Sequence, residues 1–306
     1  MVSKVFNNVL VVDSSYSLLI YLTIFDEKKE STLYIVSDGI RPEVRVNLKE
    51  TIYLRKGVCG FLDLIMKCTF SHKLRRILFN RDRYHFYGHD HLFFSPPFIN
   101  RFTIIEDGLS NYCCSNRKFP ISILLPNKVS GDGDNVERVL LSGIKDVPAE
   151  INNKVEFFSL KKSWDMLSVT YRDSINRLFS FDEKEFECCE ALLLTQPLSE
   201  DGFILEIEKI KIYQDIISQF GNMKVVIKPH PREKTNYSEI MDGCVVIDGQ
   251  YPAELICLNS KKINTVITIF STSIYSFSEC RKIIIGTENY PSLMSKVGIH
   301  YSCELI

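Results

Sequence analysis

The feature that most constrains this chain is a repeated alternation of short apolar runs, polar clusters and longer stretches with helical periodicity. The apolar runs lie at residues 9–12, 31–36, 92–94, 102–105, 121–125, 139–144, 191–194, 224–227, 245–247, 265–269 and 282–285. Helical periodicity is found at residues 18–25, 53–79, 204–220 and 252–258. Short buried strands that alternate with helices are typical of a parallel α/β sheet, so the sequence predicts the α/β class.

The length of the chain then sets the number of domains. With 306 residues, it is long enough for two domains of common size. The alternation occurs twice, in halves of similar size that join at the polar segment 146–150. We therefore predict two Rossmann-like domains, residues 1–153 and 154–306, whose parallel sheets face a central cleft.

Charge and hydropathy exclude several classes of protein. The formal net charge is -1, so the whole molecule has no field that would attract nucleic acid, and we expect no nucleic-acid partner. Arg75, Arg76, Arg81 and Arg83 form a local basic patch, which we interpret as a solvated helix face rather than an anion site. Neither a secretory signal nor a continuous apolar span is recognisable, which predicts a cytoplasmic protein. Contact with a membrane surface stays open.

The cysteines and acidic pairs do not predict a metal site. Ten cysteines are spread along the chain without a CxxC spacing, and we interpret most of them as small buried residues in a reducing compartment. Asp132-Gly133-Asp134 matches the D-x-D pattern of metal-binding acidic pairs, but it lies in a glycine-rich loop. We therefore expect no metal.

Two motifs follow predicted strands and carry ionisable groups. Glu106-Asp107-Gly108 follows the run 102–105, at the carboxyl end where parallel sheets bind ligands, although an Asp-Gly turn is also common there. Lys228-Pro229-His230-Pro231-Arg232 follows the run 224–227. Its prolines stiffen the loop and its cations favour an anion such as phosphate, so His230 is either a ligand of that anion or a structural histidine.

Three further segments of the second half are polar. Ser271-Thr272-Ser273 follows a predicted strand and offers hydroxyls to a phosphate, or it is an ordinary helix cap. The loop 195–202 contains Glu200 and Asp201, which could bring a carboxylate to the cleft. Glu254 begins a predicted helix and could accept hydrogen bonds from a ribose, or it is a capping acid.

The order of these motifs resembles that of the bacterial sialyltransferases with the GT-B fold. Within them the chain is most similar to the lipooligosaccharide sialyltransferases of glycosyltransferase family 52. The similarity extends over about residues 100–280, and the matching residues are Glu106-Asp107-Gly108 with Asn111, Lys228-Pro229-His230-Pro231-Arg232 and Phe270-Ser271-Thr272-Ser273. The loop 196–202 and Pro252-Ala253-Glu254 also match.

The resemblance implies a function and a set of site residues. It implies inverting, metal-independent transfer of sialic acid from CMP-sialic acid to a galactose-type hydroxyl of a bacterial surface glycan, with no cofactor. His230 would interact with the leaving phosphate. The nucleotide-binding residues would be Lys228, Pro231, Arg232, Glu254, Ser271, Thr272 and Ser273, and the acceptor-side residues Ser14, Ser15, Gly108 and Asn111.

Several assignments stay open at this point. The catalytic base is Asp201 or a member of the pair Glu106 and Asp107, with a slight preference for Asp201. A transferase for another nucleotide sugar and a non-catalytic nucleotide- or glycan-binding protein are the alternative functions. The acceptor, its linkage position, a lipid anchor on it, peripheral contact with the inner face of the cell membrane and a homodimer stay open as well.

Overall fold

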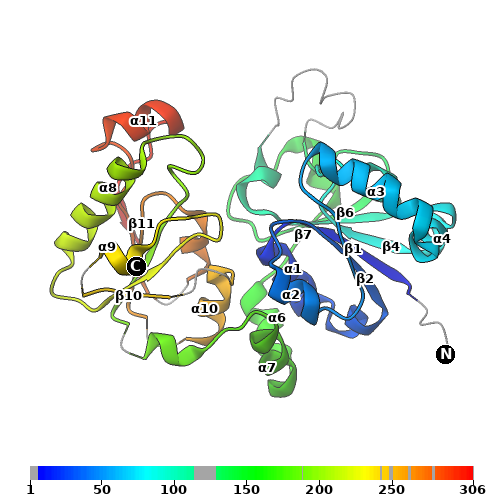
Figure 1. Cartoon of the computed structure of the whole chain (residues 1–306), viewed down its shortest axis with the longest axis horizontal. Helices are drawn as coiled ribbons and strands as arrows, with labels where there is room; N and C mark the ends of the chain where they lie inside the picture. Colours follow the sequence, from blue (N-terminus) through cyan, green and yellow to red (C-terminus); the bar gives the residue numbers. More distant parts are fainter. Residues whose placement is uncertain are drawn as a thin grey trace. The chain divides into compact units, whose positions relative to one another are not determined.

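The computed structural model describes residues 6–113, 129–187, 189–241, 243–247, 251–260, 263–277 and 280–305. The chain divides into two compact units, Met1–Leu178 (unit 1) and Phe179–Ile306 (unit 2), each organised around a mostly parallel sheet (Figure 1). The α/β prediction is confirmed. That the two sheets face one cleft stays a prediction.

Within the described residues of unit 1, seven parallel strands form one sheet in the order β3-β2-β1-β4-β5-β6-β7. The strands are β1 (Asn8–Val12), β2 (Thr32–Val36), β3 (Thr51–Tyr53), β4 (His85–Gly88), β5 (Phe102–Ile105), β6 (Val136–Leu141) and β7 (Val155–Phe157). The strand order reverses between β1 and β4, and ligands of open α/β sheets bind at the carboxyl ends of the strands beside such a reversal.

Helices cover both faces of this sheet. They are α1 (Ser15–Ile24), α2 (Pro42–Asn47), α3 (Val58–Phe70), α4 (His72–Phe79), α6 (Leu160–Met166) and α7 (Val169–Leu178). Figure 1 shows α3 and α4 on one side of the strands and α1 and α2 on the other. Helix α1 is apolar all round and almost wholly buried, because α6 packs on it and the Tyr171 hydroxyl of α7 donates to the Leu22 carbonyl at 3.1 Å.

Within the described residues of unit 2, six strands lie in the order β10-β9-β8-β11-β12-β13. They are β8 (Ala191–Leu194), β9 (Val225–Lys228), β10 (Val245–Val246), β11 (Thr265–Thr268), β12 (Arg281–Ile284) and β13 (Cys303–Leu305), which is antiparallel to β12. The helices are α8 (Glu206–Gln219), α9 (Tyr237–Ile240), α10 (Ala253–Asn259) and α11 (Pro291–Val297). Ile212, Tyr213 and Ile216 of α8 pack on the sheet.

The structure corrects the predicted domain boundary. The units divide after Leu178, whereas the sequence placed the boundary between residues 153 and 154. The polar segment 146–150 lies at the surface of unit 1 and leads into the 3-10 helix Ala149–Lys154, and β7 after it pairs with β6. The apolar surface of α1 needs α6 and α7 as a cover, so the chain after residue 153 stays with unit 1.

Two other predictions of local structure were wrong. Residues 92–94 are not a strand; the strand of this region is β4, which ends at Gly88 with φ at +120°. A Cβ at Gly88 would lie 1.9 Å from the Val11 carbonyl oxygen, so glycine allows β4 to approach β1. Of the described cysteines, all free, only Cys189 is buried, contrary to the expectation for most of them. The predicted strand 121–125 lies outside the described residues.

No helix among the described residues is both long and apolar enough to cross a membrane.

Candidate functional site

Three polar loops of unit 2 begin at one level of its sheet. Leu194 at the end of β8 is in register with Lys228 at the end of β9 and with Thr268 at the end of β11. The side-chain carbonyl of Gln196 accepts a hydrogen bond of 3.1 Å from the backbone N–H of Phe270, which ties the first of these loops to the third. The motifs that the sequence placed after separate strands therefore lie at one edge.

His230 is held by backbone contacts on both sides. Its Nδ1 accepts a hydrogen bond of 3.1 Å from the backbone N–H of Arg232, and its own backbone N–H donates to Glu233 Oε1 at 2.7 Å. An imidazole that accepts at Nδ1 carries its proton at Nε2 in the neutral form. Burial, with the charges of Arg232 and Lys228 added, lowers the pKa of His230 to about 4. The side chain is therefore a neutral imidazole with one N–H to donate.

Asp201 and Arg232 form an ion pair next to His230. Both guanidinium Nη atoms contact the carboxylate, with an Nη2–Oδ2 distance of 3.0 Å. Arg232 keeps about half of its side-chain surface exposed, so solvent can reach the pair. The structure thus joins three of the predicted site residues, Asp201, His230 and Arg232, in one unit.

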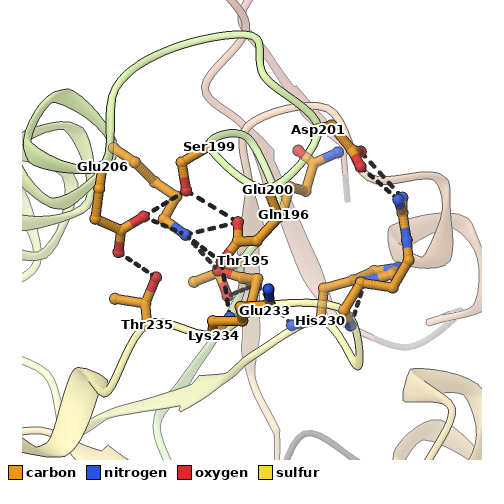
Figure 2. A network of polar contacts seen from close by, with 12 residues as sticks. Thr195, Gln196, Ser199, Glu200, Asp201, Glu206, His230, Glu233, Lys234 and Thr235 are labelled. Atoms are coloured by element: carbon orange, nitrogen blue, oxygen red, sulfur yellow. Dashed lines mark hydrogen bonds and ion pairs between the residues drawn. The ribbon is translucent and has the colours of Figure 1, made fainter.

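A buried lysine that the sequence analysis missed organises both loops (Figure 2). The side chain of Lys209 is fully buried in α8, and its Nζ lies 2.9 Å from Glu200, 3.1 Å from Glu206 and 3.7 Å from Glu233. Glu200 belongs to the loop after β8 and Glu233 to the loop after β9. One ammonium group therefore connects the two loops that carry Asp201 and His230.

The carboxylates around Lys209 extend this connection. Glu233 accepts from the Thr195 hydroxyl at 2.6 Å and from the Tyr237 hydroxyl, and burial raises its pKa. Glu200 accepts from the backbone N–H of Lys234 at 2.7 Å. Lys209 shares the buried stripe of α8 with apolar residues, and the sequence analysis did not single it out. A lysine at an apolar position of a helical pattern is the signal that could have revealed this network.

The remaining nucleotide-binding candidates differ in accessibility. Pro231 is exposed, whereas Lys228 is buried, with its Nζ 3.3 Å from the Pro229 carbonyl and 5.5 Å from the centre of the Tyr251 ring. Glu254 is buried at the start of α10. Ser271, Thr272 and Ser273 are half-exposed at the start of a short 3-10 helix, Thr272–Ser276.

In unit 1, Glu106 is a buried structural carboxylate. It accepts from the Tyr16 hydroxyl at 3.1 Å, from the Tyr112 hydroxyl at 2.8 Å and from both the hydroxyl and the backbone N–H of Ser142. Both oxygens are thus occupied and only 1% of the residue is exposed. A carboxylate in this state joins β5 to its neighbours and is poorly suited to accept a proton from a substrate.

Asp107 lies beside two histidines that the sequence analysis did not single out. Its Oδ2 is 3.8 Å from Nδ1 of His89 and 3.6 Å from Nε2 of His91. Burial alone would raise the pKa of Asp107, but these two imidazoles, with smaller contributions from Ser14 and Lys56, lower it. The missed signal was His89-Asp90-His91, a polar cluster directly after β4.

The hydrogen bonds of Ser17 place a proton on Nε2 of His89. The Ser17 hydroxyl donates to the Glu106 carbonyl at 2.6 Å, so it accepts from Nε2–H of His89 at 2.8 Å. Nδ1 of His89 is buried and has no hydrogen-bond partner among the described residues, with Asp107 Oδ2 at 3.8 Å. His89, His91 and Asp107 offer ligand atoms within 4.8 Å of one another and are the described residues that could hold a divalent metal ion.

The acceptor-side candidates surround Asp107 in supporting roles. Asn111 is buried and accepts from the backbone N–H of Asp107 at 2.6 Å. Ser14 caps α1 by accepting from the backbone N–H of Ser17 at 3.1 Å, and Ser15 donates to the Gly39 carbonyl at 3.4 Å. Gly108 has a φ of +72° and begins the 3-10 helix that follows Asp107.

Two solved structures share this architecture. A sialyltransferase from Photobacterium damsela has 12% sequence identity and a TM-score of 0.52, over 88% of this chain and 72% of that chain. The 2,6-sialyltransferase of Photobacterium sp. JT-ISH-224, solved in a ternary complex with the donor product CMP and the acceptor substrate lactose, has 12% identity and a TM-score of 0.59, over 88% and 68%. The fold is therefore that of the GT-B sialyltransferases, as the sequence predicted.

Fold and sequence together define a sialyltransferase-like glycosyltransferase. The sequence matches the model of glycosyltransferase family 52 over residues 48–288, most of the chain, and the protein belongs to that family. An uncharacterised protein of Haemophilus influenzae is 33% identical over 308 aligned positions, which cover 95% of this chain and 97% of that protein.

Replacement of Lys209 by methionine tests the buried network. The substitution keeps the length of the side chain but leaves Glu233 and Glu200 without their ammonium partner, so we expect a loss of about 3 kcal/mol in the free energy of unfolding. Urea denaturation measures this loss. Lys211→Met, at an exposed position of the same helix, is the matched control. Equal stability of the two variants would contradict the role assigned to Lys209.

The low pKa of His230 predicts a pH dependence of stability. Its folded-state pKa of about 4 lies below the ordinary value of about 6.5, so the unfolded chain binds more protons between these values. The stability that neutral His230 contributes is thus complete above about pH 6.5 and is lost as the pH falls toward 4. NMR titration of the His230 ring measures the pKa, and His230→Gln should flatten this part of the stability profile, whereas His85→Gln should not.

Proposed function

We propose that this protein is an inverting sialyltransferase that transfers sialic acid from CMP-sialic acid to a galactose-type hydroxyl of a bacterial surface glycan. The observation that carries the proposal is the neutral, oriented His230 beside Arg232 at the edge of the unit 2 sheet. Membership of family 52 and the likeness to a sialyltransferase solved with CMP and lactose support the choice of donor and acceptor.

His230 would act on the leaving phosphate. Its Nε2–H is the free donor of a ring whose Nδ1 is already bonded, so it can hydrogen-bond a phosphate oxygen of the departing CMP. Negative charge builds on that phosphate in the transition state, and the hydrogen bond from the neutral Nε2–H strengthens as it does. The contribution is therefore larger in the transition state than in the bound donor.

Other residues of the same edge would hold the nucleotide. The exposed guanidinium of Arg232 can pair with the phosphate, and the hydroxyls of Ser271, Thr272 and Ser273 can donate to it. Lys228, buried at the end of β9, would contribute positive charge, and Glu254 would accept hydrogen bonds from the ribose hydroxyls. These groups neutralise the leaving charge, so the reaction would need neither a metal ion nor a cofactor.

Asp201 would be the base that takes the proton of the acceptor hydroxyl. It lies in the same unit as His230 and is joined to it through Arg232. In the free protein the guanidinium of Arg232 contacts both carboxylate oxygens of Asp201. A bound phosphate would compete for Arg232 and so release Asp201 when the donor is present. Asp107 is the alternative base, and its histidine neighbours make it a candidate for binding the acceptor.

A donor panel tests the function. We expect release of CMP from CMP-sialic acid, faster with a galactose-terminated acceptor, and no release of UDP from UDP-sugars. Rates should be the same in EDTA, since the proposed charge stabilisation comes from side chains. UDP release would indicate a different transferase, CMP binding without turnover a non-catalytic protein, and loss of activity in EDTA that manganese restores a metal-dependent one.

His230→Ala separates catalysis from binding. We expect turnover to fall by about 10²- to 10³-fold, as for loss of a preorganised hydrogen-bond donor to a developing negative charge, with CMP affinity changed far less because Arg232 and the hydroxyls remain. Single-turnover rates, CMP affinity and the melting temperature are measured on the same protein, with His85→Ala as control. A stable variant with nearly unchanged turnover would eliminate the catalytic role of His230.

Asp201→Asn and Asp107→Asn identify the base. Removal of the base should lower the chemical step by about 10²- to 10⁴-fold and remove the acidic limb of the pH–rate profile. We expect this result for Asp201→Asn, and for Asp107→Asn mainly a higher acceptor KM. The reverse pattern would assign the base to Asp107 and leave Asp201 as a positioning residue for Arg232.

A further inference from the structure

Helix α3 has its apolar side turned outward. Val58, Phe61, Leu62, Ile65, Met66 and Phe70, spaced three or four residues apart along one face, are all exposed, and Phe70 is exposed over 89% of its surface. A helix on a soluble sheet usually buries its apolar side. The outward face of α3 therefore needs an explanation other than core packing.

Polar residues of α3 point toward the protein instead. Asp63 is buried and accepts from the Arg55 guanidinium at 2.6 and 2.9 Å, and Lys67 donates to the Tyr53 carbonyl at 2.8 Å. These contacts fix the rotation of the helix about its axis. The exposed apolar stripe is thus held in place by ion pairing on the inner side.

Helix α4 continues this surface with basic residues. Lys73, Arg75, Arg76, Arg81 and Arg83 are exposed within and just after α4, with Asp82 as the acidic residue among them. Phe79 lies between them and is 84% exposed. We call the exposed apolar side chains of α3, Phe79 and these basic residues the α3–α4 face. Exposed aromatic and aliphatic side chains next to arginines are typical of helices that lie in the surface of an anionic membrane.

The positive charge of the α3–α4 face distinguishes between two possible partners, a membrane and a second copy of the chain. In a two-fold symmetric dimer the same patch meets itself, which would bring the arginines of one copy near those of the other. Anionic lipid headgroups offer the opposite charge to Arg75, Arg76 and Arg83, while the acyl region accepts the apolar stripe. The observations therefore favour a lipid surface.

The α3–α4 face begins beside the candidate acceptor residues. Lys56, two residues before α3, pairs with Asp13 at 2.8 Å and is one of the charges that lower the pKa of Asp107. A membrane bound at α3 would therefore lie close to the edge of unit 1 that carries Asp107. An acceptor anchored in that membrane would be presented to this edge.

We infer that the α3–α4 face docks the protein on an anionic lipid bilayer, with the stripe of α3 in the interface and the arginines of α4 on the headgroups. The inference rests on this helix pair and not on the proposed reaction. The test is sedimentation of the full-length protein with vesicles of phosphatidylcholine alone and with about 30% phosphatidylglycerol. We expect binding to the anionic vesicles and its loss at about 0.5 M salt.

Two variants and a matched control assign the surface. Leu62→Gln/Ile65→Gln/Phe70→Gln should weaken vesicle binding by about tenfold or more, and Arg75→Gln/Arg76→Gln/Arg83→Gln should do the same through charge. Val46→Gln/Met166→Gln alters two exposed apolar residues elsewhere in unit 1 and should bind like the wild type. CMP release from the soluble donor should be unchanged in all three, which separates this test from that of the proposed function.

Other results would overturn the inference. Equal binding to neutral and anionic vesicles, no binding by the wild type, or a control as weak as the variants would each exclude the α3–α4 face as a lipid-binding surface. A wild-type dimer that the apolar variant dissociates, seen by light scattering, would assign the face to a second copy. A large drop in melting temperature for the apolar variant would mean that the stripe packs within the chain.

Discussion

The ammonium group of Lys209 is the interaction on which the geometry of unit 2 depends. It lies in the interior and contacts carboxylates from α8 and from the loops after β8 and β9. A buried charge is tolerated only when opposite charges and hydrogen bonds surround it, so the carboxylates have little freedom to move. Because Glu200 precedes Asp201 and Glu233 accepts from the His230 backbone, the position of both candidate catalytic groups follows from this cluster.

In unit 1 a buried carboxylate is likewise held in place, but by hydroxyl and backbone N–H donors instead of a lysine. Glu106 accepts hydrogen bonds from two tyrosines and from Ser142, and these contacts join the ends of β5 and β6 to α1. The next residue, Asp107, is left beside His89 and His91 at the open side of the edge. In adjacent positions, one carboxylate thus supports the fold and the other is available for chemistry.

The sequence predicted the architecture well where apolar runs were continuous. Strand β8 was predicted with its observed bounds, and β9, β11 and α8 within one or two residues, because most side chains on their buried faces are aliphatic or aromatic. Strand β4 was missed because its short sequence is half polar or glycine, and its stability comes from pairing with β1 and β5. Periodicity cannot report such long-range pairing.

The candidate site was predicted in part for a similar reason. His230 and Asp201 follow strands and could be found from local pattern, whereas their coupling through Arg232 joins loops far apart in the sequence. Lys209, His89 and His91 were missed because the role of each depends on residues distant in the sequence. Lys209 contacts carboxylates of the loops after β8 and β9, and the histidines lie beside Asp107, which follows β5. Local sequence shows which side chains are present but not which charges will meet.

The covering of α1 by α6 and α7 has a consequence for dividing the protein. A fragment that ended at residue 153 would retain all strands of the unit 1 sheet except β7, yet it would expose the apolar outer side of α1 to water. Such a fragment would be prone to aggregate, whereas one that ended at Leu178 would keep its own cover. Helices α6 and α7 therefore cover the core of unit 1, and the unit ends with them.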